Sequence, residues 1–120
     1  MTAEELNNIA NLWISTFNNH DLEKLLALYD ERAEHYSPKL KIRQPESGGL
    51  IKGKNAMRAW WQDSFNRLPT LEYELIQLTP LDDRVFMEYI RHVDGEIDLQ
   101  VGEMLVIKNG LIVYSRVYHS

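Results

Sequence analysis

Apolar positions in the first half of the chain recur every three or four residues in three stretches. The first covers residues 3–18, and Thr2 followed by Glu5 matches a capping box at its start. Asp21 can cap a second, shorter helix, and the third pattern covers residues 54–68, which end before a proline. We therefore expect three helices in the N-terminal half of the chain.

Between the second and third helices the pattern indicates a strand and a loop. Residues 34–36 form a strand that ends before Pro38, so His35 and Ser37 share one face. Residues 39–53 mix glycine and proline with a few apolar residues. We predict a loop there, with room for one short strand.

The second half of the chain has the period of two that is typical of strands. Turns are expected at Asp82-Asp83, Asp94-Gly95 and Asn109-Gly110, and they separate strands over residues 71–80, 84–93, 96–108 and 111–119. This order of elements predicts a single α+β domain over residues 1–120, with the helices packed on one face of a curved antiparallel sheet.

Glu103 interrupts the most apolar of these strands. Because side chains alternate along a strand, Glu103 shares a face with Val101, Leu105 and Ile107. A carboxyl group on a core face needs a partner or a proton. Two interpretations remain open: an acid that serves a ligand in a cavity, or an acid neutralised by Arg116 or by solvent.

The turn before this strand decides which residues face Glu103. A two-residue turn at Asp94-Gly95 places Glu103 opposite Phe86, on a face with Glu88 and His92. We therefore expect Phe86 directly beside the acid, and Glu88 and His92 farther along the same face, beyond the rim of a cavity.

The opposite face of the same hairpin is largely apolar. In that register it pairs Arg91 with Asp98 and exposes Met87 and Met104. Large exposed apolar patches mark contacts with another protein surface. We predict a homodimer formed through the sheet.

The last hairpin allows two registers. Residues 108–110 fit a two-residue turn or a three-residue turn with a glycine bulge. The register decides which side chains join Glu103, because a shift of one residue exchanges the two faces of a strand. The two possible sets are Ser115, Val117 and His119, or Tyr114, Arg116 and Tyr118.

Composition narrows the classes of function. Acidic residues outnumber basic ones by 18 to 13, the net charge is −5, and no Lys/Arg cluster occurs, so we expect no nucleic-acid and no membrane partner. The chain has no cysteine and no basic and apolar leader at its start, so we expect a cytoplasmic protein. No closely spaced histidine pair occurs, and we expect neither a metal nor a cofactor.

Several segments resemble the nuclear transport factor 2-like superfamily, which includes the SnoaL-like polyketide cyclases and the ketosteroid isomerases. Their order and spacing carry the resemblance, and they are residues 17–25, 28–33, 37–38, 48–54 and 109–112. The resemblance covers nearly the whole chain. It implies a cystatin-like cone in which three helices pack on the concave face of the sheet around a ligand cavity, and it implies dimers.

The resemblance also implies roles for single residues. The acid that ketosteroid isomerases keep protonated, so that it donates to the substrate oxygen, falls on Glu103. Their substrate-binding tyrosine falls on Trp13, and the supporting helix aromatics fall on Trp60 and Trp61. Their base, an aspartate before a proline, is replaced by Ser37.

We therefore expect a protein that binds a small apolar or amphipathic molecule with a carbonyl or hydroxyl group. Glu103 would protonate or donate to the oxygen, and His35 would move a proton, as in isomerases, cyclases or dehydratases. The predicted ligand-binding residues are Trp13, Phe17, Ser37, Trp60, Trp61 and His119; the family pocket places His119 inward, which favours the bulged register. The alternative is a non-catalytic ligand-binding or dimeric interaction module, which the loss of the aspartate favours.

Overall fold

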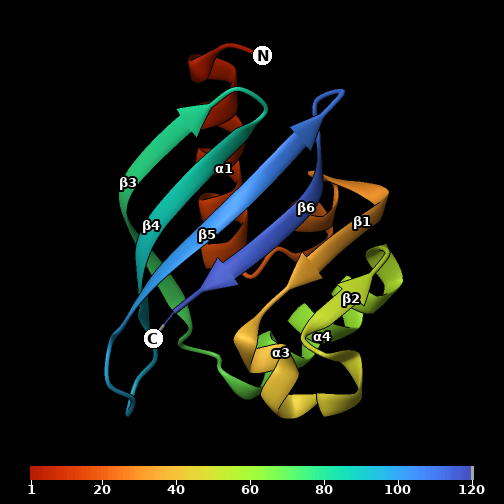
Figure 1. Ribbon diagram of the computed structural model, residues 1–120. Helices are drawn as coiled ribbons and strands as arrows, with labels where there is room; N and C mark the ends of the chain where they lie inside the picture. Colours follow the sequence, from red (N-terminus) through yellow and green to blue (C-terminus); the bar gives the residue numbers. More distant parts are fainter. Residues whose placement is uncertain (120) are drawn as a thin grey trace.

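The computed structural model describes residues 1–119 as helices layered on one open sheet (Figure 1). The helices are α1 (Ala3–Asn18), α2 (Leu22–Leu26), α3 (Pro38–Arg43), the 3-10 turn η1 (Pro45–Ser47) and α4 (Lys54–Arg67). The strands are β1 (Tyr29–Tyr36), β2 (Leu50–Lys52), β3 (Glu72–Leu81), β4 (Arg84–His92), β5 (Leu99–Lys108) and β6 (Leu111–Tyr118). They form a six-stranded curved sheet in the order β2-β1-β6-β5-β4-β3. The predicted α+β class is confirmed, but β1 and β6 pair in parallel. Two predicted strands also differ in their limits: β1 begins at Tyr29 instead of residue 34, and β5 begins at Leu99 instead of residue 96.

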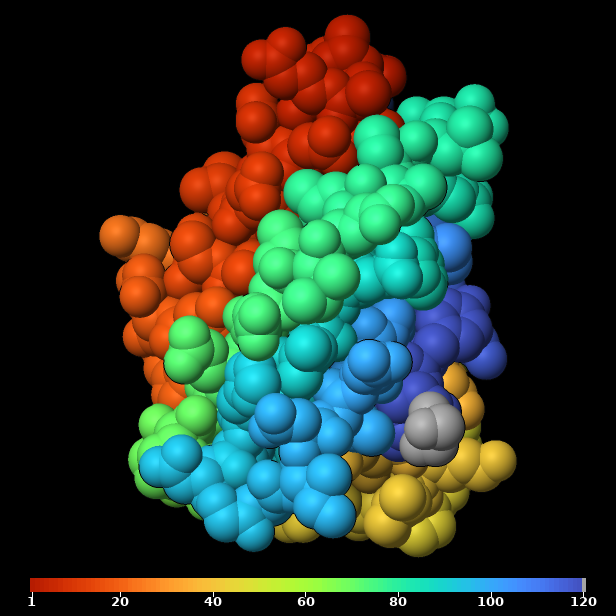
Figure 2. Space-filling model, turned by 90° about the vertical axis from the view of Figure 1, so that its left-hand side faces the viewer, coloured from red at the N-terminus to blue at the C-terminus, as the bar shows by residue number. Residues whose placement is uncertain are grey.

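Helix α1 lies along the sheet beside β3, as Figures 1 and 2 both show. The predicted capping box is present, because Thr2 and Glu5 each accept a hydrogen bond from the other's backbone N–H. At the other end of α1, the side chain of Asn18 pairs with both backbone polar groups of Tyr73 at 2.8 Å. These contacts fix the buried face of α1 over the sheet.

No helix of residues 1–119 is long and apolar enough to cross a bilayer.

Helix α3 was not predicted, because its residues were assigned to a loop. Ser37 caps this helix by accepting a hydrogen bond from the backbone N–H of Lys39, and Pro38 occupies its first position. Proline suits that position because its fixed φ is helical and the missing N–H has no helical partner. Residues 1–119 therefore form four α-helices instead of the predicted three, while the short strand expected in this region is confirmed as β2.

The predicted register between β4 and β5 is wrong by one residue. Met87, and not Phe86, lies opposite Glu103, because the connection uses all of residues 93–98 instead of a two-residue turn. Since a shift of one residue exchanges the faces of a strand, Met87 and Tyr89 join Glu103 in the core.

Two predictions that depended on this register change with it. Arg91 pairs with Glu96 instead of Asp98. Met87 is buried in the core, so it does not contribute to an apolar outer face. That face keeps Met104, which is half-buried, and the homodimer stays a prediction.

The last hairpin combines a two-residue turn with a bulge. Asn109 and Gly110 adopt positive φ angles of 52° and 80°, and the strand register shifts between Val106 and Ile107. Beyond the shift, Ser115 lies opposite Leu105. The structure therefore selects the register that brings Ser115, Val117 and His119 to the face of Glu103, as the resemblance implied.

Candidate functional site

A cavity of about 290 Å³ lies between the helices and the concave face of the sheet. All eight residues predicted as site residues border it, and they are Trp13, Phe17, His35, Ser37, Trp60, Trp61, Glu103 and His119. The sequence did not predict several other lining residues, among them Lys39, Arg43, Arg67, Tyr73, Tyr89, Arg91 and Glu96. Tyr89 and Arg91 were missed because the predicted register placed them on the opposite face.

Stacked aromatic rings form one wall of the cavity. The ring centroids of Phe17 and Tyr73 are 4.1 Å apart and nearly parallel, and those of Tyr73 and Tyr89 are also 4.1 Å apart. Trp13 stacks on Phe17 at 5.1 Å. Such a wall is apolar and rigid, and it suits the carbon frame of a flat ligand.

Glu103 is buried at the border of this cavity, with 1% of its surface exposed. Its Oε1 accepts a hydrogen bond of 2.8 Å from the Tyr89 hydroxyl, and its Oε2 has no hydrogen-bond partner among residues 1–119. Burial raises the pKa of Glu103 to about 8, although the Tyr89 hydrogen bond acts in the opposite direction. Glu103 is therefore mostly protonated at neutral pH, and Oε2 can carry the proton.

Arg116 does not neutralise Glu103. Its guanidinium lies over the Tyr36 ring, 4.2 Å from the centroid, and also over the ring of Tyr118. The interpretation in which Arg116 or solvent satisfies the Glu103 carboxyl is therefore wrong.

A chain of hydrogen bonds fixes His35 from behind the cavity wall. The Trp13 indole N–H donates to the Tyr29 hydroxyl at 3.0 Å, and Tyr29 donates to Ser115 Oγ at 3.0 Å. Ser115 is in turn 2.6 Å from Nδ1 of His35. The indole can only donate, so the Tyr29 hydroxyl accepts from it and gives its own proton to Ser115. Ser115 is fully buried, and Nδ1 of His35 is the acceptor left for its proton, which places the proton of neutral His35 on Nε2.

This arrangement makes His35 a hydrogen-bond donor toward the cavity. Burial lowers the pKa of His35 to about 4, so the ring is neutral at physiological pH. Its Nε2 has no hydrogen-bond partner in the part of the chain that the structure describes. Tyr29 and Ser115 were not predicted as contributors, because their roles depend on the pairing of β1 with β6.

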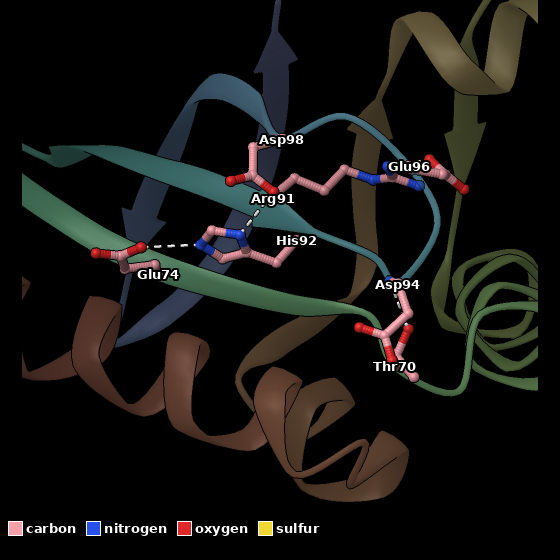
Figure 3. Close-up of polar contacts among 7 residues, drawn as sticks. All are labelled: Thr70, Glu74, Arg91, His92, Asp94, Glu96 and Asp98. Carbon is pink, nitrogen blue, oxygen red and sulfur yellow. Dashed lines mark hydrogen bonds and ion pairs between the residues drawn. The ribbon is translucent and has the colours of Figure 1, made fainter.

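The exposed end of the cavity, which we call its mouth, is lined by basic side chains. Lys39 and Arg43 come from α3, Arg67 comes from the end of α4, and Arg91 comes from β4. One carboxylate, that of Glu96, lies among them. Figure 3 shows Arg91 reaching Glu96 across the loop between β4 and β5, where Nη1 donates to Oε1 at 2.8 Å.

The loop that carries Glu96 is fixed to the sheet on its outer side. His92 lies between two carboxylates, with Nε2 2.8 Å from Glu74 and Nδ1 2.9 Å from Asp98 (Figure 3). The backbone N–H of Asp94 also donates to Thr70 Oγ1 at 2.9 Å. These contacts restrain both ends of the loop and therefore help to position Glu96.

We expect a His92→Gln variant to be destabilised more at about pH 6 than at about pH 9. Hydrogen bonds to Glu74 and then Asp98 raise the pKa of His92, because only the imidazolium can donate from both ring nitrogens. A raised pKa stabilises the fold below the ordinary value of 6.5, and this stabilisation is lost as the pH rises through the folded value. Urea unfolding of both proteins at the two pH values measures the difference. An equal difference in the free energy of unfolding at both pH values would contradict a stabilising role of the charged His92 ring.

The described residues contain no group of three histidine, cysteine or acidic side chains placed to hold a metal ion. The chemistry of the site therefore has to be argued from the carboxyl group, the imidazole and the aromatic wall.

Comparison with known sequences places most of the chain in one family. A profile of the SnoaL-like domain matches residues 10–115. No functionally curated protein matches the chain significantly.

Solved structures share the fold at low sequence identity. A SnoaL-like protein of unknown function from Burkholderia thailandensis is 24% identical and superposes with a TM-score of 0.87, covering 100% of this chain and 98% of that one. A candidate polyketide cyclase from Sinorhizobium meliloti is 15% identical, with a TM-score of 0.80 and coverage of 98% and 100%. A candidate ketosteroid isomerase from Kribbella flavida is 16% identical, with a TM-score of 0.80 and coverage of 98% and 78%. At these identities the similarity shows the fold alone.

Proposed function

Since the chain belongs to the SnoaL-like domain family, we propose that its cavity binds a small, mostly apolar molecule and that Glu103 donates a hydrogen bond or a proton to a carbonyl or hydroxyl oxygen of it. The observation that carries this proposal is the buried Oε2 of Glu103, which borders the cavity and has no partner among residues 1–119. A buried polar group without a partner is costly, and a ligand oxygen can supply that partner.

The pKa of Glu103 suits a general acid. A carboxyl group with a pKa of about 8 holds its proton at neutral pH and can still release it to a developing oxyanion. The hydroxyl of Tyr89 donates to Oε1 and so leaves Oε2 to carry the proton. Protonation of a ligand oxygen is the reaction step that this geometry supports best.

His35 supplies a second donor on the same concave face. It lies on β1 and Glu103 lies on β5, with only β6 between them. Two strand spacings and the offset along the strands put their Cα atoms ~12 Å apart. A two-ring molecule lying on the aromatic wall is long enough to contact both side chains.

A second candidate function is ligand binding without catalysis. The observation that favours it is the state of His35: its pKa of about 4 makes it a weak base, and Nδ1 is engaged by Ser115. Ser37, at the position where the resemblance implies an aspartate base, instead caps α3. The site therefore has a strong candidate acid and no comparably placed strong base.

We expect the neutral ketone 2-acetonaphthone to bind the wild type more weakly as the pH rises through about 8, because an ionised Glu103 cannot donate to a carbonyl. In Glu103→Gln the pH dependence should disappear, and in Glu72→Gln, an exposed control on β3, it should remain. Quenching of the tryptophan fluorescence measures the affinity. Identical pH profiles for wild type and Glu103→Gln would refute the role of Glu103.

Deuterium exchange distinguishes the enzyme from the binder. An acid/base enzyme should accelerate exchange of the methyl protons of 2-acetonaphthone in D₂O, and Glu103→Gln should slow it by roughly 100-fold or more. Proton NMR of the ketone follows the reaction. Binding without any accelerated exchange would support the non-catalytic function.

A further inference from the structure

We propose that the ligand of this cavity is an amphipathic anion whose carboxylate, or another oxyanion, binds at the exposed end between Lys39 and Arg91. This inference extends the proposed function, on which its account of the buried end rests, by naming the charge and orientation of the ligand. The apolar body would lie along the aromatic wall, and the carbonyl or hydroxyl oxygen would reach Glu103.

The cavity mouth is rich in basic side chains, although the chain as a whole is acidic. The whole chain has a net charge of −5, yet four basic side chains and one carboxylate line the mouth. Two of the four, Arg67 and Arg43, are 2.8 Å and 3.9 Å from Asp63. A positive mouth on an acidic protein favours entry of an anion.

Arg91 is the most buried of the basic side chains in this proposed anion site. It is 7% exposed, and the only hydrogen bond of its guanidinium within residues 1–119 is the one from Nη1 to Glu96. A guanidinium has five N–H donors in a planar fork that fits a carboxylate with two parallel hydrogen bonds. Four donors of a nearly buried Arg91 therefore remain for a ligand.

Lys39 lies in the field of the other cations and makes no ion pair in the described part of the chain. Burial lowers the pKa of Lys39, and the positive charge of Arg91 lowers it further. A ligand anion would offset this repulsion between the cations. The ammonium and the guanidinium together offer both charge and direction to one oxyanion.

Glu96 occupies the place of the ligand anion in the free protein. Its carboxylate is the only one that lines the mouth among residues 1–119, and it is 45% exposed at the side chain. Its loop is anchored on the far side by His92 and Thr70 (Figure 3). When a ligand carboxylate replaces that of Glu96, the Arg91 guanidinium has an anionic partner both in the free protein and in the complex.

The test compares 6-acetyl-2-naphthoate with its methyl ester, which keeps the ketone and the rings but has no charge. We expect the wild type to bind the carboxylate at least roughly tenfold more tightly than the ester, as a charge-assisted hydrogen bond allows. Lys39→Met should lose most of this preference, and added salt should reduce it. Lys41→Met is the matched control, because Lys41 lies on α3, is exposed and does not line the cavity.

Glu96→Gln provides the opposite change. Removal of the competing carboxylate should tighten binding of the naphthoate and leave binding of the ester unchanged.

Equal affinity of the wild type for the two compounds would overturn the inference, and so would equal weakening of naphthoate binding by Lys39→Met and Lys41→Met. If the ester binds with the pH dependence of Glu103 and the carboxylate adds nothing, the anion site fails while the proposed function stands. If the naphthoate depends on Lys39 but Glu103→Gln changes nothing, the proposed function fails while the anion site stands.

Discussion

A Glu103→Gln variant is expected to become progressively more stable than the wild type as the pH rises from about 5 to about 9. In the folded protein the pKa of Glu103 is raised from 4.5 to about 8. Between these values the folded protein holds a proton that the unfolded chain has released. The stability that the protonated acid allows is fully present below the unfolded value and is lost as the pH rises through the folded value.

The size of this effect follows from the same two pKa values. Each pH unit in that interval costs the wild type about 1.4 kcal/mol, so the loss approaches roughly 5 kcal/mol above about pH 8. This is a large part of the free energy of unfolding of an ordinary domain. Glutamine cannot ionise, so the variant does not suffer this loss.

Urea unfolding at several pH values measures the effect as the difference between the two proteins. His35 and the other titrating groups contribute alike to both proteins and cancel in the difference. Glu72→Gln, which changes an exposed carboxyl on β3, should follow the wild type throughout. Parallel curves for wild type and Glu103→Gln would show that the Glu103 carboxyl is not held protonated in the folded state.

A Ser115→Ala variant is expected to lose roughly 2–5 kcal/mol of stability, because it leaves two buried groups without a partner. Tyr29 loses the acceptor of its hydroxyl, and Nδ1 of His35 loses its donor. Ser115 is itself fully buried, so water cannot replace it without opening the core.

Ser64→Ala is the matched control for this change. Ser64 is also buried, but its hydroxyl only adds to the hydrogen bonding of its own helix by donating to the backbone carbonyl of Trp60 at 3.0 Å. Its loss should cost less than roughly 1 kcal/mol. Urea unfolding compares the two variants, and an equal loss in both would contradict the assigned network.

The tautomer of His35 gives a second and independent measure of the network. Long-range ¹H–¹⁵N NMR spectra of the wild type should show the proton of His35 on Nε2, since Ser115 donates to Nδ1. In Ser115→Ala the preference for this tautomer should weaken. A proton on Nδ1 in the wild type would show that His35 donates to Ser115 and would contradict the assigned direction of that hydrogen bond.

Local patterns in the sequence predicted most of the elements. The apolar spacing of residues 3–18, with Thr2 and Glu5, is sufficient to define α1, because both helix period and capping act within a few residues. The apolar spacing alone predicted α4, whose first residue follows Gly53 without a side-chain cap. Helix α3 was missed because its six residues are too few to show a helical period, although Ser37 and Pro38 form a recognisable helix start.

In the candidate site, the direction of the Glu103 side chain was predictable from the sequence, but its neighbours were not. The period of two along β5 placed Glu103 on the core face, and this was confirmed by its burial. The neighbours of Glu103 on β4 could not be predicted correctly, because the register there depends on how the whole of residues 93–98 folds. One residue of difference exchanged Phe86 for Met87 and moved Tyr89 into hydrogen-bonding distance of the acid.

By itself, the sequence determined the α+β class, the positions of the two long helices and the inward direction of Glu103, since each depends on residues close together along the chain. Only the tertiary structure decided the partners of Glu103 and His35. Tyr89 reaches Glu103 through the register of β4 on β5, and Ser115 reaches His35 from 80 positions away through the parallel pairing of β1 with β6. The protonation of both groups follows from these contacts and from burial, because a pKa responds to solvent exclusion and neighbouring groups in space and not to neighbours in sequence.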